Sequence, residues 1–505
     1  MEAQASYDEV YIISDLHMGG EGEFQMFAAG KRLVKFIDGL TGTSPSRNVA
    51  LVINGDMVDF LAEPNPTYFD INGAVGRLNR IAGDASFKPV FEALERFVKK
   101  IRRTLIINMG NHDLELALPW VREHFLDLLS GGDERARGRI RLVVDGTGVR
   151  CKVGKADVLC LHGNEVDPAN YADYHHLRKI GFQVQSGNDV DPWTPNGGTR
   201  LVIDVMNEIK KDHPFVDLLK PIVDAVVPTL LVLDVNMADK IDDALRLISR
   251  VQTDAVRGRF GWLSDDDLLD AVEAAPEGQL LKGMVDETFP EWAEEADVSL
   301  DALLEEIEAG LEKDPLAAES SSDSDAEMLG AGTIIGLQMK KFVNWIRGRN
   351  KPADRKKLLF EALQPLCKVE ASRDAFASDT RDRTYNELEK QVGGDIDFLV
   401  TGHTHMHKAI RRRDGLEGMY YNCGTWVQLI RIDLPYLDSL SAFTPVYDAL
   451  SAGSIKALQA VKGLIMDRHS VVVIKAEGDA AVGELFEVRA TGAMDPVAGT
   501  RYKRG

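Results

Sequence analysis

The feature of the sequence that most constrains its fold is a series of short apolar runs, most of which end in a polar cluster of Gly, Asp, Asn or His. Segments with apolar residues at helical spacing, 24–40 and 87–102, separate the first runs. Strands that alternate with helices predict an α/β fold with a parallel sheet, in which ligand sites lie at the carboxyl ends of the strands. The strand candidates are 10–14, 49–54, 104–109, 140–144 and 157–161, followed later by 396–400, 419–421, 470–476 and 484–488.

The polar clusters supply carboxylate, amide and imidazole groups but no cysteine, a combination that suits divalent ions such as Mn, Fe or Zn. One such cluster alone is typical of a turn, but five turns are not expected to form a complete ligand set by chance. Gly55, Gly110 and Gly402 fit sharp strand exits with close backbone approach. The clusters are Asp15-Leu16-His17, Gly55-Asp56-Met57-Val58-Asp59, Gly110-Asn111-His112-Asp113, His162-Gly163-Asn164 and Gly402-His403-Thr404-His405.

The chemistry of these groups fits a hydrolase that uses two metal ions. Two cations about 3.5–4 Å apart need a bridging carboxylate, and together they activate a water and clamp phosphate oxygens. Asp56 is the natural bridge, and His112 is placed to protonate the leaving oxygen or to stabilise negative charge. Asp113 is expected to orient or charge-tune His112, and Asp59 to brace a ligand. We therefore predict His112, Asp113 and Asp59 as catalytic residues.

In this order the clusters read D-x-H, G-D-x-x-D, G-N-H-D, H-G and G-H-T-H. This pattern resembles the five-block signature of the calcineurin-like metallophosphoesterase family over residues 7–170 and 393–490. The resemblance implies an α/β fold, namely a two-sheet αβ sandwich with helices on both outer faces. It also implies an enzyme in which a hydroxide bridging two metal ions attacks phosphorus in line with the leaving group, to hydrolyse a phosphoester or pyrophosphate bond.

The same resemblance implies the ligands and the ions. One ion is expected to bind Asp15, His17, Asp56 and His405, and the other Asp56, Asn111, His162 and His403. Manganese is the expected ion, with Fe, Zn or Ni as alternatives.

The sequence changes character after His162 and becomes mostly helical. We interpret 1–170 and 393–495 as two parts of one metallophosphoesterase core. A mostly helical insertion or cap, 171–392, divides them and carries acidic tracts at 264–270 and 291–312 and an acidic low-complexity loop near 318–327. Residues 496–505 are expected to be a C-terminal tail. Helix candidates within the insertion are 334–347 and 356–366.

The charge and composition of the chain limit the kinds of molecule it is expected to bind and the compartment in which it is expected to occur. The chain of 505 residues has 59 Lys and Arg against 80 Asp and Glu, a formal net charge of −21, which argues against binding of long nucleic acid. The four cysteines are too few and too scattered for a disulfide framework. The N-terminus lacks the pattern of a signal peptide, and the apolar stretch Pro214–Leu233 contains charges and prolines that argue against a membrane span. We expect a cytoplasmic protein, with peripheral membrane contact left open.

The substrate is expected to be a phosphate-containing small molecule, a nucleotide or a lipid-linked compound. A more distant resemblance is to UDP-2,3-diacylglucosamine hydrolases, which also carry a helical insertion between the H-G and G-H-T-H blocks; here Pro214–Leu233 would line an apolar groove. Those chains are shorter and have Arg where this one has His112. The alternative is a nuclease or cyclic-nucleotide phosphodiesterase, for which His112 is the expected residue and Arg347–Lys351 a basic patch. An inactive scaffold is disfavoured because the full ligand set is present.

The remaining features are interpreted as structural. His175, His176, His213 and His407 are expected to be structural or surface residues. The segment 422–425 is expected to close a strand near the site, with Cys423 as a small buried apolar residue rather than a nucleophile.

Overall fold

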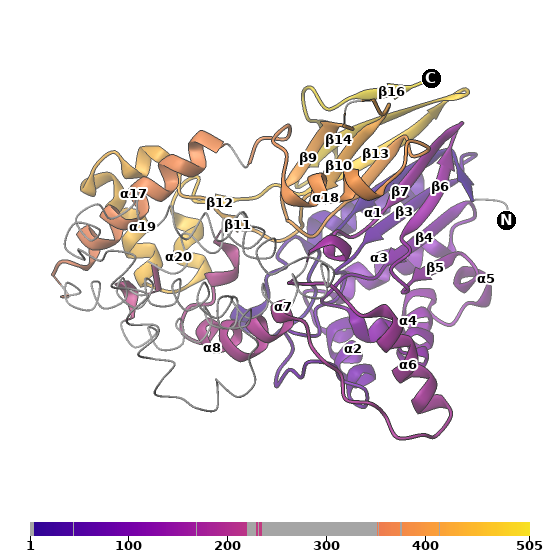
Figure 1. Ribbon diagram of the computed structural model, residues 1–505, viewed down its shortest axis with the longest axis horizontal. Coiled ribbons are helices and arrows are strands. Elements are labelled where there is room, and N and C mark those ends of the chain that lie inside the picture. The colour runs from indigo at the N-terminus through magenta and orange to yellow at the C-terminus, as the bar shows by residue number, and fades with distance from the viewer. Residues whose placement is uncertain are drawn as a thin grey trace, which may run out of the picture. The chain divides into compact units, whose positions relative to one another are not determined.

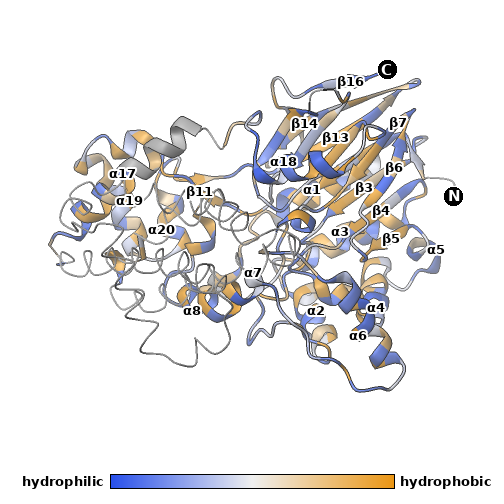
Figure 2. Cartoon of the chain, in the orientation of Figure 1, coloured by the Kyte–Doolittle hydropathy of each residue, from blue (hydrophilic) through white to orange (hydrophobic). Residues whose placement is uncertain are grey.

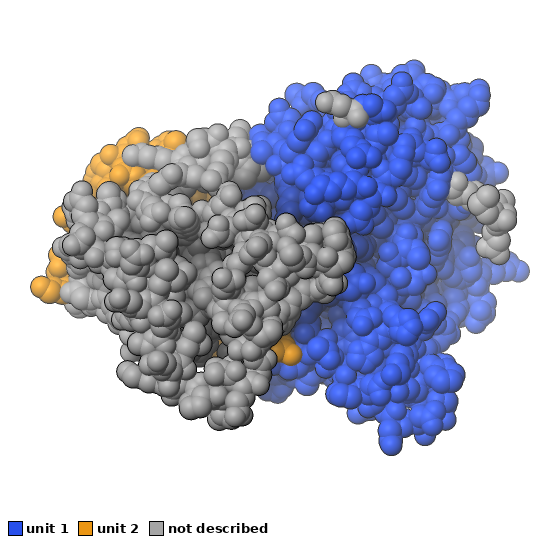
Figure 3. Space-filling model, viewed as in Figure 1, with its two compact units in different colours: residues 1–199, 373–429, 466–505 blue, residues 200–372, 430–465 orange. Residues whose placement is uncertain are grey.

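The computed structural model describes residues 5–43, 45–167, 169–219, 229–230, 232–234, 351, 353–373, 376–413 and 415–505. The chain divides into two compact units, coloured in Figure 3: residues 1–199, 373–429 and 466–505 form the first, and 200–372 with 430–465 the second. Several predicted segments lie outside the described residues. They are both acidic tracts, the low-complexity loop near 318–327, the helix candidate 334–347, residues 347–350 of the basic patch and half of Pro214–Leu233.

The helices are α1 (Gly30–Gly42), α2 (Ala74–Gly83), α3 (Lys88–Lys99), α4 (Pro119–Ser130), α5 (Glu134–Arg137), α6 (Tyr174–Gln185), α7 (Gly197–Arg200), α8 (Asn207–Lys210), α17 (Arg355–Arg373), α18 (Arg383–Gln391), α19 (Leu440–Ser451) and α20 (Ile455–Ala460). A π-helical segment, Leu201–Met206, joins α7 to α8. Within the described residues, none of these helices has both the length and the apolar character needed to cross a membrane.

The strands are β1 (Ser6–Tyr7), β2 (Glu9–Ile13), β3 (Val49–Asn54), β4 (Arg103–Asn108), β5 (Ile140–Val143), β6 (Val149–Val153), β7 (Ala156–Cys160), β8 (Phe398–Thr401), β9 (His407–Arg411), β10 (Met419–Cys423), β11 (Leu429–Ile430), β12 (Ile465–Met466), β13 (Ser470–Glu477), β14 (Ala480–Val488), β15 (Met494–Pro496) and β16 (Tyr502–Arg504).

The centre of the first unit is a sheet in the order β15-β14-β13-β2-β3-β4-β5, with β16 also paired to β14. Strands β2, β3, β4 and β5 are parallel, with Ile12 opposite Val52 and Val52 opposite Ile106. Strands β2 and β3 are buried along their whole length, as is usual for parallel strands covered on both faces. Figure 2 shows β3 and β4 as largely apolar, which explains why the sequence shows continuous apolar runs here.

Alternate residues of these strands face two different layers. Tyr11 and Ile13 belong to a core shared with the buried faces of α1, α3 and α4, whereas Val10 and Ile12 belong to a core shared with the second sheet. Helices α1 and α3 lie beside β3 and β4 in Figure 1. The eight-stranded sheet therefore has helices on one face and another sheet on the other.

The second sheet has the order β1-β6-β7-β8-β10-β9. Its inner residues, such as Val158 and Phe398, pack in the core between the sheets. On its outer face, Leu399 and Tyr420 pack with Tyr385 and Leu388 of α18. Two stacked sheets with helices on both outer faces confirm the α/β sandwich predicted from the sequence.

The C-terminal part differs from the expected division of the chain. Residues 496–505 were expected to form a tail, but they contain β16, whose residues 502–504 pair with 481–483 of β14. Strand β14 is long enough to pair with β15 near one end and β16 near the other, so the last residues complete an otherwise open sheet edge. Residues 430–465, expected within the second part of the core, belong instead to the second unit and contain α19 and α20.

Candidate metal centre

The five polar clusters follow the carboxyl ends of strands in both sheets. Strands β2, β3 and β4 of the larger sheet end at Ile13, Asn54 and Asn108, each immediately or closely before a cluster. Strands β7 and β8 of the smaller sheet end at Cys160 and Thr401. Because β7 and β8 are parallel to each other, their ends also share an edge. Stacking the two sheets brings all five clusters to one site.

The backbone is strained at the predicted ligands. Positive φ angles are rare for residues other than glycine and cluster at functional sites. In the described chain seven such residues occur, and five of them are predicted ligands. These are Asp15 (φ 55°), His17 (47°), Asp56 (51°), His403 (67°) and His405 (62°). The fold therefore holds these side chains in directions that ordinary strand or helix geometry would not give.

Gly55, Gly110 and Gly402 all make room for ligands, and a Cβ on Gly402 would overlap the carboxylate of Asp15. Gly55 has φ 95°, and a Cβ there would overlap the imidazole of His162. A Cβ on Gly110 would overlap both the carboxylate and the backbone nitrogen of Asp56. At these positions the close approach itself requires glycine.

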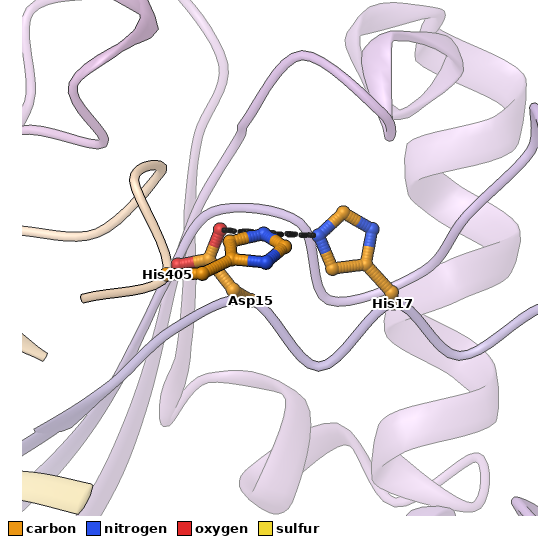
Figure 4. Close-up of side chains that lie close together, drawn as sticks. All are labelled: Asp15, His17 and His405. Atoms are coloured by element: carbon orange, nitrogen blue, oxygen red, sulfur yellow. Dashed lines mark hydrogen bonds and ion pairs between the residues drawn. The ribbon is translucent and has the colours of Figure 1, made fainter. Parts of the chain in front are cut away.

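The first ligand cluster consists of Asp15, His17 and His405. The Nε2 atoms of His17 and His405 face one another at 3.1 Å, and the Asp15 carboxylate lies 3.4 Å from the His405 nitrogen and 3.9 Å from that of His17. Figure 4 shows the two rings directed toward each other beside this carboxylate. Residues 15 and 405 are far apart in the sequence, so only the fold brings them together.

This cluster has the dimensions of a cation site. Ligand atoms about 2.0–2.2 Å from a bound cation lie roughly 3.0–3.6 Å from one another. The separations of 3.1 and 3.4 Å fall in this range, as does the 3.6 Å between His17 Nε2 and the Asp56 carboxylate. The donor set of imidazole nitrogens and carboxylate oxygens therefore fits a divalent ion.

The second ligand cluster adjoins the first and consists of Asp15, Asp56 and His162. His162 Nε2 lies 3.2 Å from the Asp56 carboxylate, and the ring of His403 lies 5.3 Å from that of His162 between centroids. Asn111 is buried, and its Oδ1 atom has no hydrogen-bond partner among the residues that the structure describes. An unpaired buried amide oxygen costs free energy unless something binds it, and a cation ligated by Asn111 would remove that cost.

Three of the predicted ligand histidines have one ring nitrogen held by an oxygen atom. His17 Nδ1 lies 3.0 Å from Asp59, His162 Nδ1 lies 2.8 Å from the main-chain oxygen of Asn54, and His403 Nε2 lies 2.8 Å from Asp167. Such contacts fix the orientation and tautomer of metal-binding histidines. The Asp59 contact agrees with the prediction that this residue braces a ligand.

The charges of the two clusters partly offset one another. Burial raises the pKa of Asp15, but His405 and His162 outweigh this effect and lower the pKa to about 2. Neighbouring histidines likewise overcome burial and hold the pKa of Asp56 well below its usual range. Burial lowers the pKa of His162, but the Asp56 carboxylate prevails and raises it to about 10. A proton on His162 thus offsets part of the carboxylate charge, and a divalent cation can replace it.

His112 contacts a different carboxylate from the one expected. Its Nδ1 atom lies 3.1 Å from Asp59, the same oxygen that contacts His17. The other Asp59 oxygen accepts the N–H groups of residues 61 and 62. Burial raises the pKa of Asp59, but the contacts with His112 and His17 outweigh it and hold the pKa well below its usual range. Asp59 is therefore an ionised carboxylate that touches both a predicted ligand and the predicted acid.

Asp113 was expected to orient His112, but its carboxylate is engaged elsewhere. It accepts the backbone N–H of Gly110 at 2.7 Å and that of Met57 at 2.9 Å. Burial and the nearby Asp56 charge raise the pKa of Asp113 to about 7. Asp113 thus links the backbone of its own cluster, at Gly110, to the backbone of the Gly55–Asp59 cluster, at Met57. The backbone N–H of His112 itself donates to Asp56 at 2.8 Å.

Sequence reasoning missed several residues that shape the site. Asp167 contacts His403, and the Glu165 carboxylate accepts the backbone N–H of His162 at 3.1 Å and of Gly163 at 2.6 Å. Their only sequence signal is acidity in the loop that follows His162. The main-chain oxygen of Asp15 accepts hydrogen bonds from residues 425 and 426, directly after β10. The segment 422–425 does close a strand beside the site, as predicted.

Among the described residues, neither ligand cluster includes a histidine that was interpreted as a structural or surface residue. His407 is in β9, where burial lowers its pKa to about 4, and His213 is in the second unit, where burial lowers its pKa. His175 and His176 belong to α6. Cys423 is buried, and burial raises the pKa of its thiol well above the usual range. That shift agrees with an apolar role and argues against a thiolate nucleophile.

The two adjoining clusters, at the ends of strands from two stacked sheets, form a site suited to divalent cations, as in metal-dependent phosphoesterases. Residues 9–218 match the family model described as calcineurin-like phosphoesterase. The match places this part of the chain in the metallophosphoesterase superfamily and confirms the family predicted from the five blocks, the last of which lies beyond the matched range. Comparisons with curated proteins and with solved structures gave no match.

Proposed function

We propose that this protein hydrolyses a phosphoester or pyrophosphate bond with the help of two divalent cations. The observation that carries the proposal is the position of the Asp56 carboxylate. One of its oxygen atoms lies 3.6 Å from Nε2 of His17 and 3.2 Å from Nε2 of His162, and these histidines are predicted ligands of different cations. A carboxylate in that position is suited to bridge two ions.

The bound cations would supply Lewis acidity, which activates a water and neutralises phosphate charge. The chain's own residues hold the remaining parts of the reaction in place. Asp56 keeps its orientation because one of its oxygens accepts the backbone N–H of His112. Asp15 is fixed by the backbone N–H of His403 at 3.0 Å. Both carboxylates are thus preorganised, so little reorganisation is needed when substrate arrives.

His112 is the proposed general acid. Since Nδ1 lies 3.1 Å from the Asp59 carboxylate, a proton given to the leaving oxygen would come from the other ring nitrogen, Nε2. Since Asp59 stays ionised, it also favours the positive charge that a proton-donating imidazole carries. Removing this acid is expected to lower the rate while leaving the ligands of both cations intact.

The proposal is tested by Asp56→Asn, assayed with bis-p-nitrophenyl phosphate and added Mn²⁺. Loss of a bridging ligand should remove several kcal/mol of transition-state stabilisation, which corresponds to a fall of about 10³-fold in kcat/KM. Asp173→Asn is the matched control because Asp173 is exposed and caps α6 through the N–H of His176, a role that Asn also fills. Wild-type activity in Asp56→Asn would overturn the two-cation mechanism.

The substrate class can be identified by assaying a panel of monoesters, linear and cyclic diesters, nucleotide pyrophosphates and lipid-linked diphosphates. We propose a small phosphate compound, a nucleotide or a lipid-linked molecule, acted on in the cytoplasm, rather than long nucleic acid. The alternatives are a nuclease or cyclic-nucleotide phosphodiesterase and a pyrophosphatase of the UDP-2,3-diacylglucosamine hydrolase type. Turnover of cyclic or linear diesters would favour the first, and selective turnover of the lipid-linked diphosphate the second.

A further inference from the structure

The histidines of the two cation sites are held by carboxylates that come from different parts of the chain. His17, at the first site, contacts Asp59 of the second sequence block. His403, at the second site, contacts Asp167 through Nε2 at 2.8 Å. Asp167 lies outside every block of the family signature and follows the short turn Asn164–Val166.

Asp167 is itself held in a fixed orientation. The oxygen atom that contacts His403 also accepts the side-chain N–H of Asn170 at 2.7 Å, and the other oxygen accepts the backbone N–H of Ala169 at 3.0 Å. The carboxylate is therefore held by contacts with both a ligand ring and its own loop.

This contact decides which nitrogen of His403 is available to a cation. An imidazole whose Nε2–H donates to a carboxylate can bind a cation only through Nδ1. The carboxylate also makes the ring a stronger electron donor, since it partly accepts the remaining proton. The ring lies beside His162, whose own Nε2 faces Asp56.

We propose that Asp167 is a positioning residue that orients His403 toward the second cation and so sets the affinity of that cation, separately from the first. The inference rests on the proposed two-cation function. Asp59 has the corresponding role toward His17 and the first cation. The two cations are thus tuned by independent carboxylates, one within the family signature and one outside it.

The experiment uses the full-length protein stripped of metal and titrated with Mn²⁺, with binding followed by calorimetry and electron paramagnetic resonance. Wild type should bind two ions and show the signal of an exchange-coupled pair. In Asp167→Asn and Asp167→Ala the first ion should bind as in wild type, whereas the second should bind about 10–100-fold more weakly. Asp167→Ala should show the larger loss because the amide oxygen of Asn can still accept the Nε2–H bond.

At a Mn²⁺ concentration that just saturates wild type, both variants should therefore show the signal of an isolated ion. Asp173→Asn, a change in the nearby cap of α6, should behave as wild type. Thermal unfolding of the metal-free proteins separates a positioning role from a structural one, because only a structural role would lower the unfolding temperature and weaken both ions together.

The inference is wrong if both Asp167 variants bind the second ion with wild-type affinity, or if they lose both ions in parallel with stability. Either result would leave the proposed function intact. If wild type itself binds fewer than two ions, the two-cation function fails, and this inference fails with it.

Discussion

The two cation sites of this protein are built differently, although they adjoin each other. The first brings Asp15, His17 and His405 within direct ligand distance, and its bracing carboxylate Asp59 belongs to the same signature. The second depends on an unpaired amide oxygen of Asn111 and on a histidine held by a loop residue. The first site therefore takes its ligands and its bracing carboxylate from the signature alone, whereas the second is braced by a carboxylate outside the signature.

The largest loss of cation binding and activity is expected for Gly110→Ala, which should affect both cation sites alike. The added Cβ would overlap Asp56, the carboxylate proposed to be shared, so both cations and nearly all activity should be lost. The number of ions bound per chain is measured by metal analysis after gel filtration. Gly39→Ala, in an exposed part of α1 where nothing lies within 4 Å, is the control and should keep both ions. Two tightly bound ions in Gly110→Ala would contradict the assigned bridge.

His112→Gln should lower kcat by about 10²–10⁴-fold without changing either cation affinity, since a general acid contributes about that much and is not a ligand. The measurement is kcat with bis-p-nitrophenyl phosphate beside a Mn²⁺ titration. His124→Gln provides the control because His124 contacts Asn79 in a part of the chain remote from the clusters. A loss of cation binding would show that His112 is a ligand and not an acid.

Asp59→Asn should weaken the first cation about 10–100-fold and leave the second unchanged, the reverse of the pattern expected for Asp167→Asn. The reason is that Asp59 contacts His17 and Asp167 contacts His403. Calorimetric titration of both variants under one set of conditions compares the two sites directly. If both substitutions weakened the same ion, the assignment of one carboxylate to each site would be wrong.

The change expected for a single pH unit is smaller and concerns cation binding at the second site. His162 has its pKa raised to about 10 in the cation-free protein, so cation binding below that pH must release its proton. Affinity for the second cation should rise about tenfold per pH unit over this range. Calorimetry in two buffers with different ionisation enthalpies counts the released protons, and His162→Asn removes this contribution.

The raised pKa of His162 acts in the opposite direction on the stability of the metal-free protein, which should fall as pH rises. A histidine with a raised folded pKa contributes stability that is complete below its unfolded pKa of about 6.5 and is lost as pH rises through about 10. Chemical unfolding of the metal-free protein should thus show declining stability from neutral to alkaline pH. An unchanged free energy of unfolding across that range would contradict the raised pKa.

Much of the fold could be predicted from the sequence because parallel strands covered on both faces are continuous apolar runs. The run at 49–54 coincides with β3, and the runs near 10–14 and 104–109 lie within one residue of β2 and β4. Strand β6 was missed because Val149–Val153 alternates exposed and buried residues and is too short to show a clear period. Residues 502–504 looked like a tail because a three-residue edge strand has no pattern of its own.

The candidate ligands could be predicted because each cluster is local and follows a recognisable strand. The contacts between clusters could not. Asp113 looked like the partner of His112 by adjacency, yet its carboxylate accepts backbone N–H groups while Asp59 approaches the ring. Neighbours in sequence at a strand exit point in different directions, so adjacency is weak evidence for contact.

The sequence by itself indicated which groups could bind cations and where the strands before them, such as β2, β3 and β4, would end, since both depend on short stretches of residues. The tertiary structure alone decided which groups meet. His17 and His405 are 388 positions apart, and Asp167 and His403 are 236 positions apart. Both contacts exist because two sheets stack and align the ends of their strands, and stacking depends on the packing of whole faces rather than on any local pattern.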